Sequence, residues 1–358
     1  MNSPSESILD PGRKKILLVQ ESIPDYRVPI FTAIGRHHDL SVTSVRPEFG
    51  EGFRTVPIVV RRRGPFFFIG KGSLPDLRSY DVVIFTFNIR WLNLWSTLIR
   101  LRRTPRVILW GIGVSSEDGF DKSTRWNWLR CAAARMADAV IVYSDYALPR
   151  YAAGGVCRRK LFVAHNTLAL TPRLADGEKQ YFLFVGTLKR YKRAEDLVRL
   201  YRGLLTANPG LPPLHIVGDG ELRESLVAET RSLGLTEKVV FRGRIADEAG
   251  LEAVYRHAIA SVSPYQAGLS VLQSLAMGVP FVTRRDSITG GERFNVVHDR
   301  TGLLADDDAG IAKAMLQLAY DPVTRNRLAQ GAFDHFVSNC SVERMVGGFL
   351  SAVQYATA

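Results

Sequence analysis

Three cations gather in a short loop in the second half of the chain. An apolar run at 181–188, typical of a buried strand, ends near Gly186, and Lys189, Arg190 and Lys192 follow before a helical segment. Positive charge at a helix start opposes the helix macrodipole, so it lowers helix stability unless an anion lies nearby. This pattern favours a diphosphate site with Lys192 as a ligand, and a solvated basic surface is the alternative.

A Gly-Leu-Ser sequence at 268–270 precedes another predicted helix. Gly268 lets the backbone pass close to a ligand, and Ser270 has the side chain of a helix cap. Free N–H groups at a helix start bind phosphate. We therefore expect a second phosphate contact here, with a plain capped helix packed on a sheet as the alternative.

Glycine turns and one carboxylate follow other apolar runs. The turn at 218–220 has two glycines around an aspartate and suits a backbone that lies flat against a ring, and Gly243 marks a second turn. Glu292 follows two glycines after the run at 280–285. Each of these signals alone is weak, because Gly-Asp turns and exposed loop glutamates are common.

The elements that position these loops are predicted by alternating patterns. Apolar runs recur at 14–20, 40–45, 81–87, 106–112 and 139–144, and again at 181–188, 214–220, 238–244, 260–265 and 280–285, with helical segments between them. That alternation predicts βαβ units and an α/β protein with two Rossmann-like halves. In such sheets ligands bind at the carboxyl ends of the strands, where the loops described above lie.

Length and composition agree with two folded domains. The chain has 358 residues, of which 46% are hydrophobic and 23% charged. We expect a disordered leader at 1–13, an N-terminal domain at 14–168, a polar linker at 169–180, a C-terminal domain at 181–335 and a final helix at 336–358 that could return to the N-terminal domain.

Charge and cysteine content narrow the partners. The net charge of +12 predicts an anionic partner: nucleic acid, an anionic membrane or a phosphorylated small molecule. The 3 cysteines are odd in number and match no metal-ligand spacing, so we expect no disulfide framework. We also expect no bound metal and no cofactor. No run is long enough for a signal peptide or a membrane span, which predicts a cytoplasmic protein.

Taken in order, the loops resemble the nucleotide-sugar-binding half of glycosyltransferase family 4. The order is G-T-L-x-x-x-K, V-G-D-G-x-L, F-x-G, S-P-Y-x-x-G-L-S-V-L-x-S-L-A-x-G-V-P, G-G-E and T-G-L-L. The resemblance covers about 181–308 and extends more weakly through 24–31, 109–113 and 163–167. It implies the GT-B fold, with two Rossmann-like domains facing across a cleft, and retaining transfer from a nucleotide-diphosphate sugar without a bound metal.

The resemblance also implies a set of site residues. Lys192, Arg190 and Glu292 would be catalytic: Lys192 would stabilise the leaving diphosphate, and Glu292 lies in the loop that contacts the sugar. The donor, a UDP- or GDP-sugar, would be bound by Gly186, Thr187, Lys189, Gly218, Asp219, Gly220, Arg244, Gln266, Gly268, Leu269, Ser270 and Gln273.

Four positions depart from the family pattern. Gln266 and Gln273 stand where the family has two glutamates, with six residues between them instead of seven; Thr187 replaces an arginine, and Ile112 a histidine. Gln273 can still bond ribose hydroxyls, whereas Gln266 carries no full negative charge. Lys189 or Arg190 could supply the missing cation. These departures keep open a second hypothesis, a related protein that binds a nucleotide sugar without turnover.

The acceptor is expected in the first half, where the sequence is less informative. Tyr26 and Arg27 follow the first predicted strand, Asn88 and Arg90 follow the third, and Asp118 lies in the loop after the fourth. The alternatives are packing at a helix start for the first pair and stacking on a neighbouring tryptophan for Arg90.

Basic and aromatic residues alternate in three segments of the first half, 59–73, 94–106 and 125–137. This composition fits a contact with anionic lipid headgroups at the inner face of the cell membrane, unless the apolar residues are core and the cations merely solvated. A polyprenyl-diphosphate-linked acceptor in polysaccharide or exopolysaccharide biosynthesis would follow. No nucleic-acid-binding signature is present, and no Gly-x-Gly-x-x-Gly follows the first strand, so nucleic-acid binding and dinucleotide-dependent oxidoreduction are disfavoured.

Overall fold

A computed structural model describes residues 12–46, 50–70, 72–101, 104–115 and 121–358. By their contacts, these residues form two compact units. The first comprises the described residues of Met1–Val114, Thr124–Ala164 and Val342–Ala358, and the second those of Ser115–Ser123 and His165–Ser341. The chain therefore passes from the first unit to the second and returns at its end.

The first unit is built on a parallel seven-stranded sheet with the order β3-β2-β1-β6-β7-β8-β9. Its strands are β1 (Lys15–Val19), β2 (Asp39–Ser44), β3 (Arg54–Pro57), β6 (Val82–Thr86), β7 (Arg106–Gly111), β8 (Ala139–Val142) and β9 (Leu161–Val163). Its helices are α1 (Val28–His37), α2 (Leu92–Arg100), α3 (Asn127–Met136), α4 (Leu148–Ala153) and α11 (Val342–Thr357), and a two-stranded hairpin of β4 (Val60–Arg63) and β5 (Phe66–Ile69) is added to it.

The last helix of the chain completes the core of the first unit. Met345 and Phe349 of α11 are fully buried with the strand residues Ile16 and Ile84, and the ring of Phe349 lies 5.0 Å from that of Trp110. The single helix expected at 336–358 is in fact two helices. The helical structure is interrupted at 340–341, between α10 (Pro322–Asn339) and α11.

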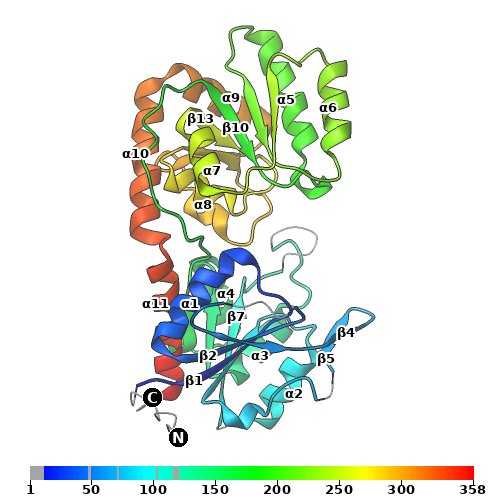
Figure 1. Cartoon of the computed structure of the whole chain (residues 1–358), viewed down its shortest axis with the longest axis vertical. Helices are drawn as coiled ribbons and strands as arrows, with labels where there is room; N and C mark the ends of the chain where they lie inside the picture. Colours follow the sequence, from blue (N-terminus) through cyan, green and yellow to red (C-terminus); the bar gives the residue numbers. More distant parts are fainter. Residues whose placement is uncertain (1–11, 47–49, 71, 102–103, 116–120) are drawn as a thin grey trace, which may run out of the picture. The chain divides into compact units, whose positions relative to one another are not determined.

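The second unit is a parallel six-stranded sheet with the order β12-β11-β10-β13-β14-β15. Two of its neighbouring strands, β10 and β13, are labelled in Figure 1. Its strands are β10 (Tyr181–Val185), β11 (Leu214–Val217), β12 (Val239–Gly243), β13 (Ala258–Val262), β14 (Phe281–Arg284) and β15 (Gly302–Ala305). Its helices are α5 (Ala194–Ala207), α6 (Arg223–Ser232), α7 (Glu248–Arg256), α8 (Ser270–Ala276), α9 (Asp308–Tyr320) and α10.

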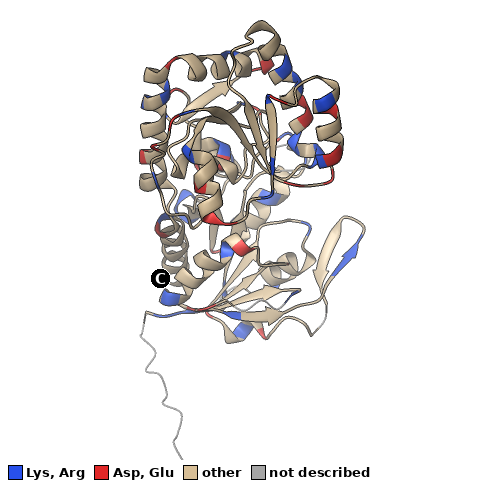
Figure 2. Ribbon diagram, turned by 45° about the horizontal axis from the view of Figure 1, so that its top comes forward, with Lys and Arg blue, Asp and Glu red and all other residues tan. Residues whose placement is uncertain are grey.

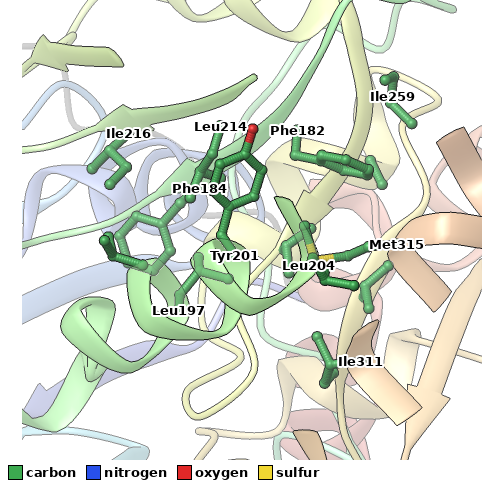
Figure 3. Close-up of a cluster of buried hydrophobic side chains, with 14 of the residues drawn as sticks. Phe182, Phe184, Leu197, Tyr201, Leu204, Leu214, Ile216, Ile259, Ile311 and Met315 are labelled. Carbon is green, nitrogen blue, oxygen red and sulfur yellow. The ribbon is translucent and has the colours of Figure 1, made fainter. Parts of the chain in front are cut away.

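Helix α5 packs on this sheet because its apolar residues repeat with helical spacing. Leu197, Tyr201 and Leu204 lie on one face and meet Phe182 and Phe184 of β10 (Figure 3). Burying each large apolar side chain stabilises the fold by about 1.5–3 kcal/mol. The helix is thereby fixed against the strand whose end carries the cation loop.

The strand order creates a switch point beside β10. The chain moves outward from β10 through β11 and β12 on one side, and then returns to add β13, β14 and β15 on the other. The loops after β10 and β13 consequently diverge, which leaves a crevice at the carboxyl edge of the sheet.

The segment expected to be a linker belongs to the second unit. The amide of Arg173 donates to the carbonyl of Ala276 at 2.9 Å, and that of Gln180 donates to the carbonyl of His257 at 2.8 Å. Residues 169–180 therefore run along the second unit and end where β10 begins.

All ten expected strands form, with ends that differ by a few residues. Five further strands were not predicted from the sequence: β3, β9, β15 and the two strands of the β4–β5 hairpin, each only three or four residues long. Among the residues that the structure describes, none of the helices has both the length and the apolar character needed to cross a bilayer.

Candidate functional site

A cavity of about 430 Å³ opens at the switch point of the second sheet. It lies entirely within the second unit, between the loops that follow β10, β11, β12, β13 and β14. Its lining consists of Val185, Gly186, Thr187, Tyr191, Lys192, Val217, Gly218, Asp219, Arg244, Ile245, Gln266, Gly268, Leu269, Ser270, Gln273, Gly290 and Glu292. Its size is in the range of small-molecule sites, about 300–1,000 Å³.

One wall of the cavity exists because position 218 is glycine. Gly218 has a φ of +147°, and a Cβ atom there would lie 1.8 Å from the carbonyl oxygen of Gly186. Only glycine tolerates both this backbone angle and this close approach. The ends of β10 and β11 therefore present bare backbone to the cavity.

Lys192 is a partly buried cation at the cavity. It ends a 3-10 turn (Arg190–Lys192) after β10, and its Nζ donates a hydrogen bond to Oε1 of Gln266. Burial lowers the pKa of Lys192 to about 8, and the charge of Glu292 partly offsets that effect. An ammonium group whose charged form is disfavoured in this way gains strongly from an anionic ligand.

Glu292 is a buried carboxylate, 5% exposed, that also lines the cavity. Its Oε1 accepts from Nδ2 of Asn166 at 2.5 Å, and its Oε2 accepts from Oγ1 of Thr289 at 3.1 Å and from the amide of Gly290 at 2.9 Å. These donors hold the side chain in one orientation toward the cavity.

The structure corrects the role expected for Ser270. Leu269, not Ser270, is the N-cap of α8, and no side chain caps this helix. The Ser270 hydroxyl is buried at the cavity and has no hydrogen-bond partner among the described residues. Leaving such a group unpaired costs about 1–3 kcal/mol, which a ligand oxygen would recover.

Most of the residues expected to bind the donor or to be catalytic meet at this cavity, and three do not. Lys189 and Arg190 are exposed and are not part of the lining, and neither is Gly220, which lies against the backbone of Leu188. The lining residues that the sequence analysis missed are Val185, Tyr191, Val217, Ile245 and Gly290. The position of Tyr191, directly before Lys192, was the one available signal for its inclusion.

Of the expected acceptor residues, Tyr26, Arg27, Asn88 and Arg90 lie in the first unit after its strands β1 and β6, and the two arginines have packing roles. Arg27 is only 3% exposed, and its guanidinium lies 4.7 Å from the ring of Trp110 and 5.0 Å from that of Tyr26. This burial contradicts an exposed acceptor contact for Arg27 and matches the packing alternative.

The second expected acceptor pair is also engaged within the first unit. Arg90 lies 5.4 Å from the ring of Phe67, which stacks on Trp91, and the side chain of Asn88 accepts from the amide of Arg90 at 3.1 Å. Asp118 lies outside the described residues. Acceptor contacts by Tyr26 and Asn88 stay predictions.

The run of three aspartates after β15 has structural partners. Asp306 pairs with Arg285 at 3.1 Å, Asp307 caps α9 through the amide of Gly310 at 2.7 Å, and Asp308 accepts from the Tyr265 hydroxyl at 2.9 Å. Two of these contacts connect the segment after β15 to the loops that follow β13 and β14, and the third caps α9.

Comparison with known families identifies the part of the chain that builds the cavity. Residues 179–321 match the profile of the family described as Glycosyl transferases group 1. This part of the chain belongs to that family. The group 1 match begins just before β10 and ends at the start of α10, so it contains every residue that lines the cavity.

Curated relatives of this group 1 domain are glycosyltransferases. The lipopolysaccharide core biosynthesis glycosyltransferase LpsE of Rhizobium meliloti is 29% identical over 154 residues, which are 42% of this chain and 44% of LpsE. A D-inositol 3-phosphate glycosyltransferase of Actinosynnema mirum is 31% identical over 57% of this chain and 48% of that protein. The chain thus spans less than half the length of these relatives.

Solved structures similar to the whole chain confirm the expected fold. HepE of Anabaena, crystallised with UDP, has a TM-score of 0.67 at 15% identity, with 94% of this chain and 98% of HepE covered. TarM has a TM-score of 0.70 at 10% identity, with 95% of this chain and 98% of TarM covered. The chain has the α/β GT-B fold of these glycosyltransferases.

Proposed function

We propose that this protein is a retaining glycosyltransferase that moves a sugar from a nucleotide-diphosphate sugar to an acceptor hydroxyl. The observation that supports this most strongly is the cavity of the group 1 domain, which brings a buried cation, an unpaired hydroxyl and an oriented carboxylate together: Lys192, Ser270 and Glu292. A nucleotide sugar has a diphosphate for the first two groups and sugar hydroxyls for the third.

The donor is oriented by the chemistry of the lining. The diphosphate binds Lys192 and the loop Gly268–Ser270, and the base lies against the bare backbone at Gly218 and beside Arg244. Gln273 forms hydrogen bonds with the ribose hydroxyls. The crystallisation of HepE with UDP and with UDP-glucose supports a UDP-sugar as the first donor to test.

Bond exchange at the anomeric carbon then needs little from the protein except charge stabilisation. The bond between this carbon and the diphosphate oxygen breaks, and the acceptor oxygen bonds to the carbon on the same face. The acceptor proton passes to the leaving diphosphate, whose growing negative charge Lys192 stabilises. We propose that this transfer needs no metal ion.

Gln266 suits this chemistry although it replaces a glutamate of the family pattern. Its amide oxygen accepts from Lys192 and so orients the ammonium group. A glutamate here would neutralise that charge, whereas a neutral amide leaves it available to the diphosphate. The substitution therefore does not by itself argue against activity.

A lipid-linked acceptor at an anionic membrane is the second part of the proposal. Arg61, Arg63 and Phe66 are exposed on the hairpin. Strand β5 of the hairpin packs against α2, and α2 packs on α3. Helix α3 carries Trp128, which is 64% exposed. Figure 2 shows the blue of lysine and arginine residues on this hairpin. Cations beside exposed aromatic side chains favour lipid phosphates and the interfacial region of a bilayer.

Vesicle binding tests the membrane contact. The protein should co-sediment with phosphatidylglycerol vesicles and not with phosphatidylcholine vesicles, and Trp128→Ser should weaken binding several-fold. Tyr320→Ser is the matched control, because Tyr320 is 58% exposed on α9 of the second unit. Equal binding to both lipids, or equal loss in both variants, would contradict the contact.

Nucleotide release tests the transfer itself. The purified protein is incubated with UDP- and GDP-sugars, with and without polyprenyl-diphosphate-linked acceptors, in the presence of EDTA. Acceptor-dependent release of UDP or GDP is expected. Binding without any release would favour the second hypothesis, a protein that holds a nucleotide sugar without turnover, and the absence of all nucleotide binding would contradict both.

A further inference from the structure

A buried polar network behind the cavity holds Glu292. Asn166 is 6% exposed and lies just after β9, far from Glu292 in the sequence. Its Nδ2 donates to Oε1 of Glu292 at 2.5 Å. A carboxylate needs a donor at this point, which fixes the orientation of the Asn166 amide.

The other contacts of Glu292 come from its own loop. Thr289 donates its hydroxyl proton to Oε2, while its Oγ1 accepts from the amides of Gly291 at 3.0 Å and Arg293 at 3.1 Å. The amide of Gly290 also donates to Oε2. Asn166 is therefore the one described side chain from outside the loop that bonds this carboxylate.

Counting acceptor positions shows what the network leaves free. A carboxylate has about four lone-pair positions, two on each oxygen. The two positions of Oε2 are taken by Thr289 and Gly290, and one of Oε1 is taken by Asn166. One position of Oε1 stays available on a side chain that lines the cavity.

We propose that Asn166 is a positioning residue: it holds Glu292 so that the remaining acceptor position of Oε1 binds one hydroxyl of the donor sugar. This inference rests on the proposed function. Asn166 does not line the cavity and acts through Glu292. It thereby controls the affinity for the sugar moiety and leaves the affinity for the nucleotide moiety unchanged.

The hydrogen bonding of the Asn166 amide fits a positioning role better than a packing role alone. Its Oδ1 is buried without a partner among the described residues. A side chain selected only for stability would satisfy both ends of the amide, because an unpaired buried oxygen costs about 1–3 kcal/mol. In Asn166 the oxygen stays unpaired, while the nitrogen makes a charge-assisted hydrogen bond to the carboxylate of Glu292.

Calorimetric titration with UDP, UDP-glucose, UDP-galactose, UDP-N-acetylglucosamine, GDP and GDP-mannose tests the inference. In Asn166→Ala, affinity for the nucleotide sugar that the wild type binds should fall roughly tenfold, the size of a lost hydrogen bond to a charged group. Affinity for the free nucleoside diphosphate should stay within about twofold.

Asn166→Asp adds a signature that a packing defect would not produce. Two carboxylates at this distance share a proton at low pH, and they repel each other once that proton is lost at higher pH. Sugar-nucleotide affinity should be weak at about pH 7.5 and recover most of the wild-type value at about pH 5.5. Lys192, with a pKa of about 8, begins to lose its charge at the upper end of this window, so the wild type measured at both pH values gives the part of the change that Asn166→Asp does not cause. Burial, together with the charges of Arg300 and His165, lowers the pKa of His335.

Thr167→Val is the matched control. Thr167 is the next residue, is fully buried and donates to the carbonyl of Cys340 without touching Glu292. It should lower thermal stability and leave the ratio of sugar-nucleotide to nucleotide affinity unchanged. Equal losses for both ligands in Asn166→Ala, or no recovery in Asn166→Asp, would overturn the inference. Failure of the proposed function has a different outcome, in which the wild type binds none of the nucleotides.

Discussion

Lys192 sets the electrostatic character of the cavity. It is held by a neutral partner, Gln266, and faces a carboxylate that three other groups already bind. Its lowered pKa shows that the protein bears a cost for keeping this charge in place. Such a cost is expected for a residue whose charge is only partly compensated, by Glu292, until an anionic ligand binds.

Replacing this lysine should separate binding from stability. Lys192→Met keeps most of the side-chain volume and removes the charge, so affinity for UDP or GDP should fall about tenfold or more. The free energy of unfolding should stay the same or rise by about 1–2 kcal/mol, because a poorly solvated charge is removed. Titration and urea unfolding measure the two effects, and a stable variant with unchanged affinity would remove Lys192 from the site.

The same lysine predicts a pH dependence of nucleotide affinity. The pKa of Lys192 is about 8, so the free protein loses this charge above that pH, and affinity for UDP or GDP should decline as pH rises from 7 toward 9.5. The affinity of Lys192→Arg for UDP or GDP should not change over this pH range, since a guanidinium stays charged. Identical pH profiles for wild type and Lys192→Arg would contradict the assignment.

At the residue scale, the sequence predicted the site better in the second half than in the first. Lys192, Gly268 and Glu292 follow strands, and their types match anion and sugar chemistry, so local order was enough to find them. Arg27 also follows a strand, but its burial depends on the rings of Trp110 in β7 and Tyr143 just after β8, which are distant in the sequence. This packing could not be predicted from the sequence around Arg27.

Among the elements, the close approach of β10 and β11 is the most demanding feature. Gly218→Ala would drive a Cβ atom into the carbonyl of Gly186, so we expect a loss of about 2–4 kcal/mol of stability and of nucleotide binding. Gly203→Ala is the control, since nothing lies within 4 Å of its Cβ position on α5, and it should stabilise by about 0.5–1 kcal/mol. Chemical denaturation compares the two, and equal stabilities would contradict the described turn.

Element prediction succeeded where burial gives a strong pattern. The strand β1 is buried on both faces and reads as a continuous apolar run. The edge strand β3 is short and half exposed, and β15 contains a glycine, so neither carries a comparable signal. Their pairing is set by neighbouring strands and not by their own sequence.

At the scale of the whole molecule, the return of α11 to the first unit ties the end of the chain to its beginning. Two adjacent glycines test this docking. A Cβ atom at Gly348 would lie 2.4 Å from the carbonyl of Val163, whereas nothing lies within 4 Å at Gly347. Gly348→Ala should therefore destabilise the first unit by about 1–3 kcal/mol, and Gly347→Ala should stabilise it slightly.

Hydrogen exchange resolves where the Gly348→Ala effect acts. Protection should decrease in the strands of the first unit and stay unchanged around the cavity of the second. Loss of protection throughout both units, or none in either, would contradict this division. The sequence predicted two halves, but not the packing of 169–180 onto the second, because polar composition alone does not distinguish a packed segment from a free one.

We propose that the cavity of the group 1 domain holds the diphosphate of a nucleotide sugar. A crystal structure with the nucleotide that binds most tightly among UDP, GDP and their sugars tests it most directly. We predict that diphosphate oxygens lie within hydrogen-bond distance of Nζ of Lys192 and of the Ser270 hydroxyl, with the base beside Gly218. A nucleotide bound elsewhere, with these groups untouched, would contradict the claim.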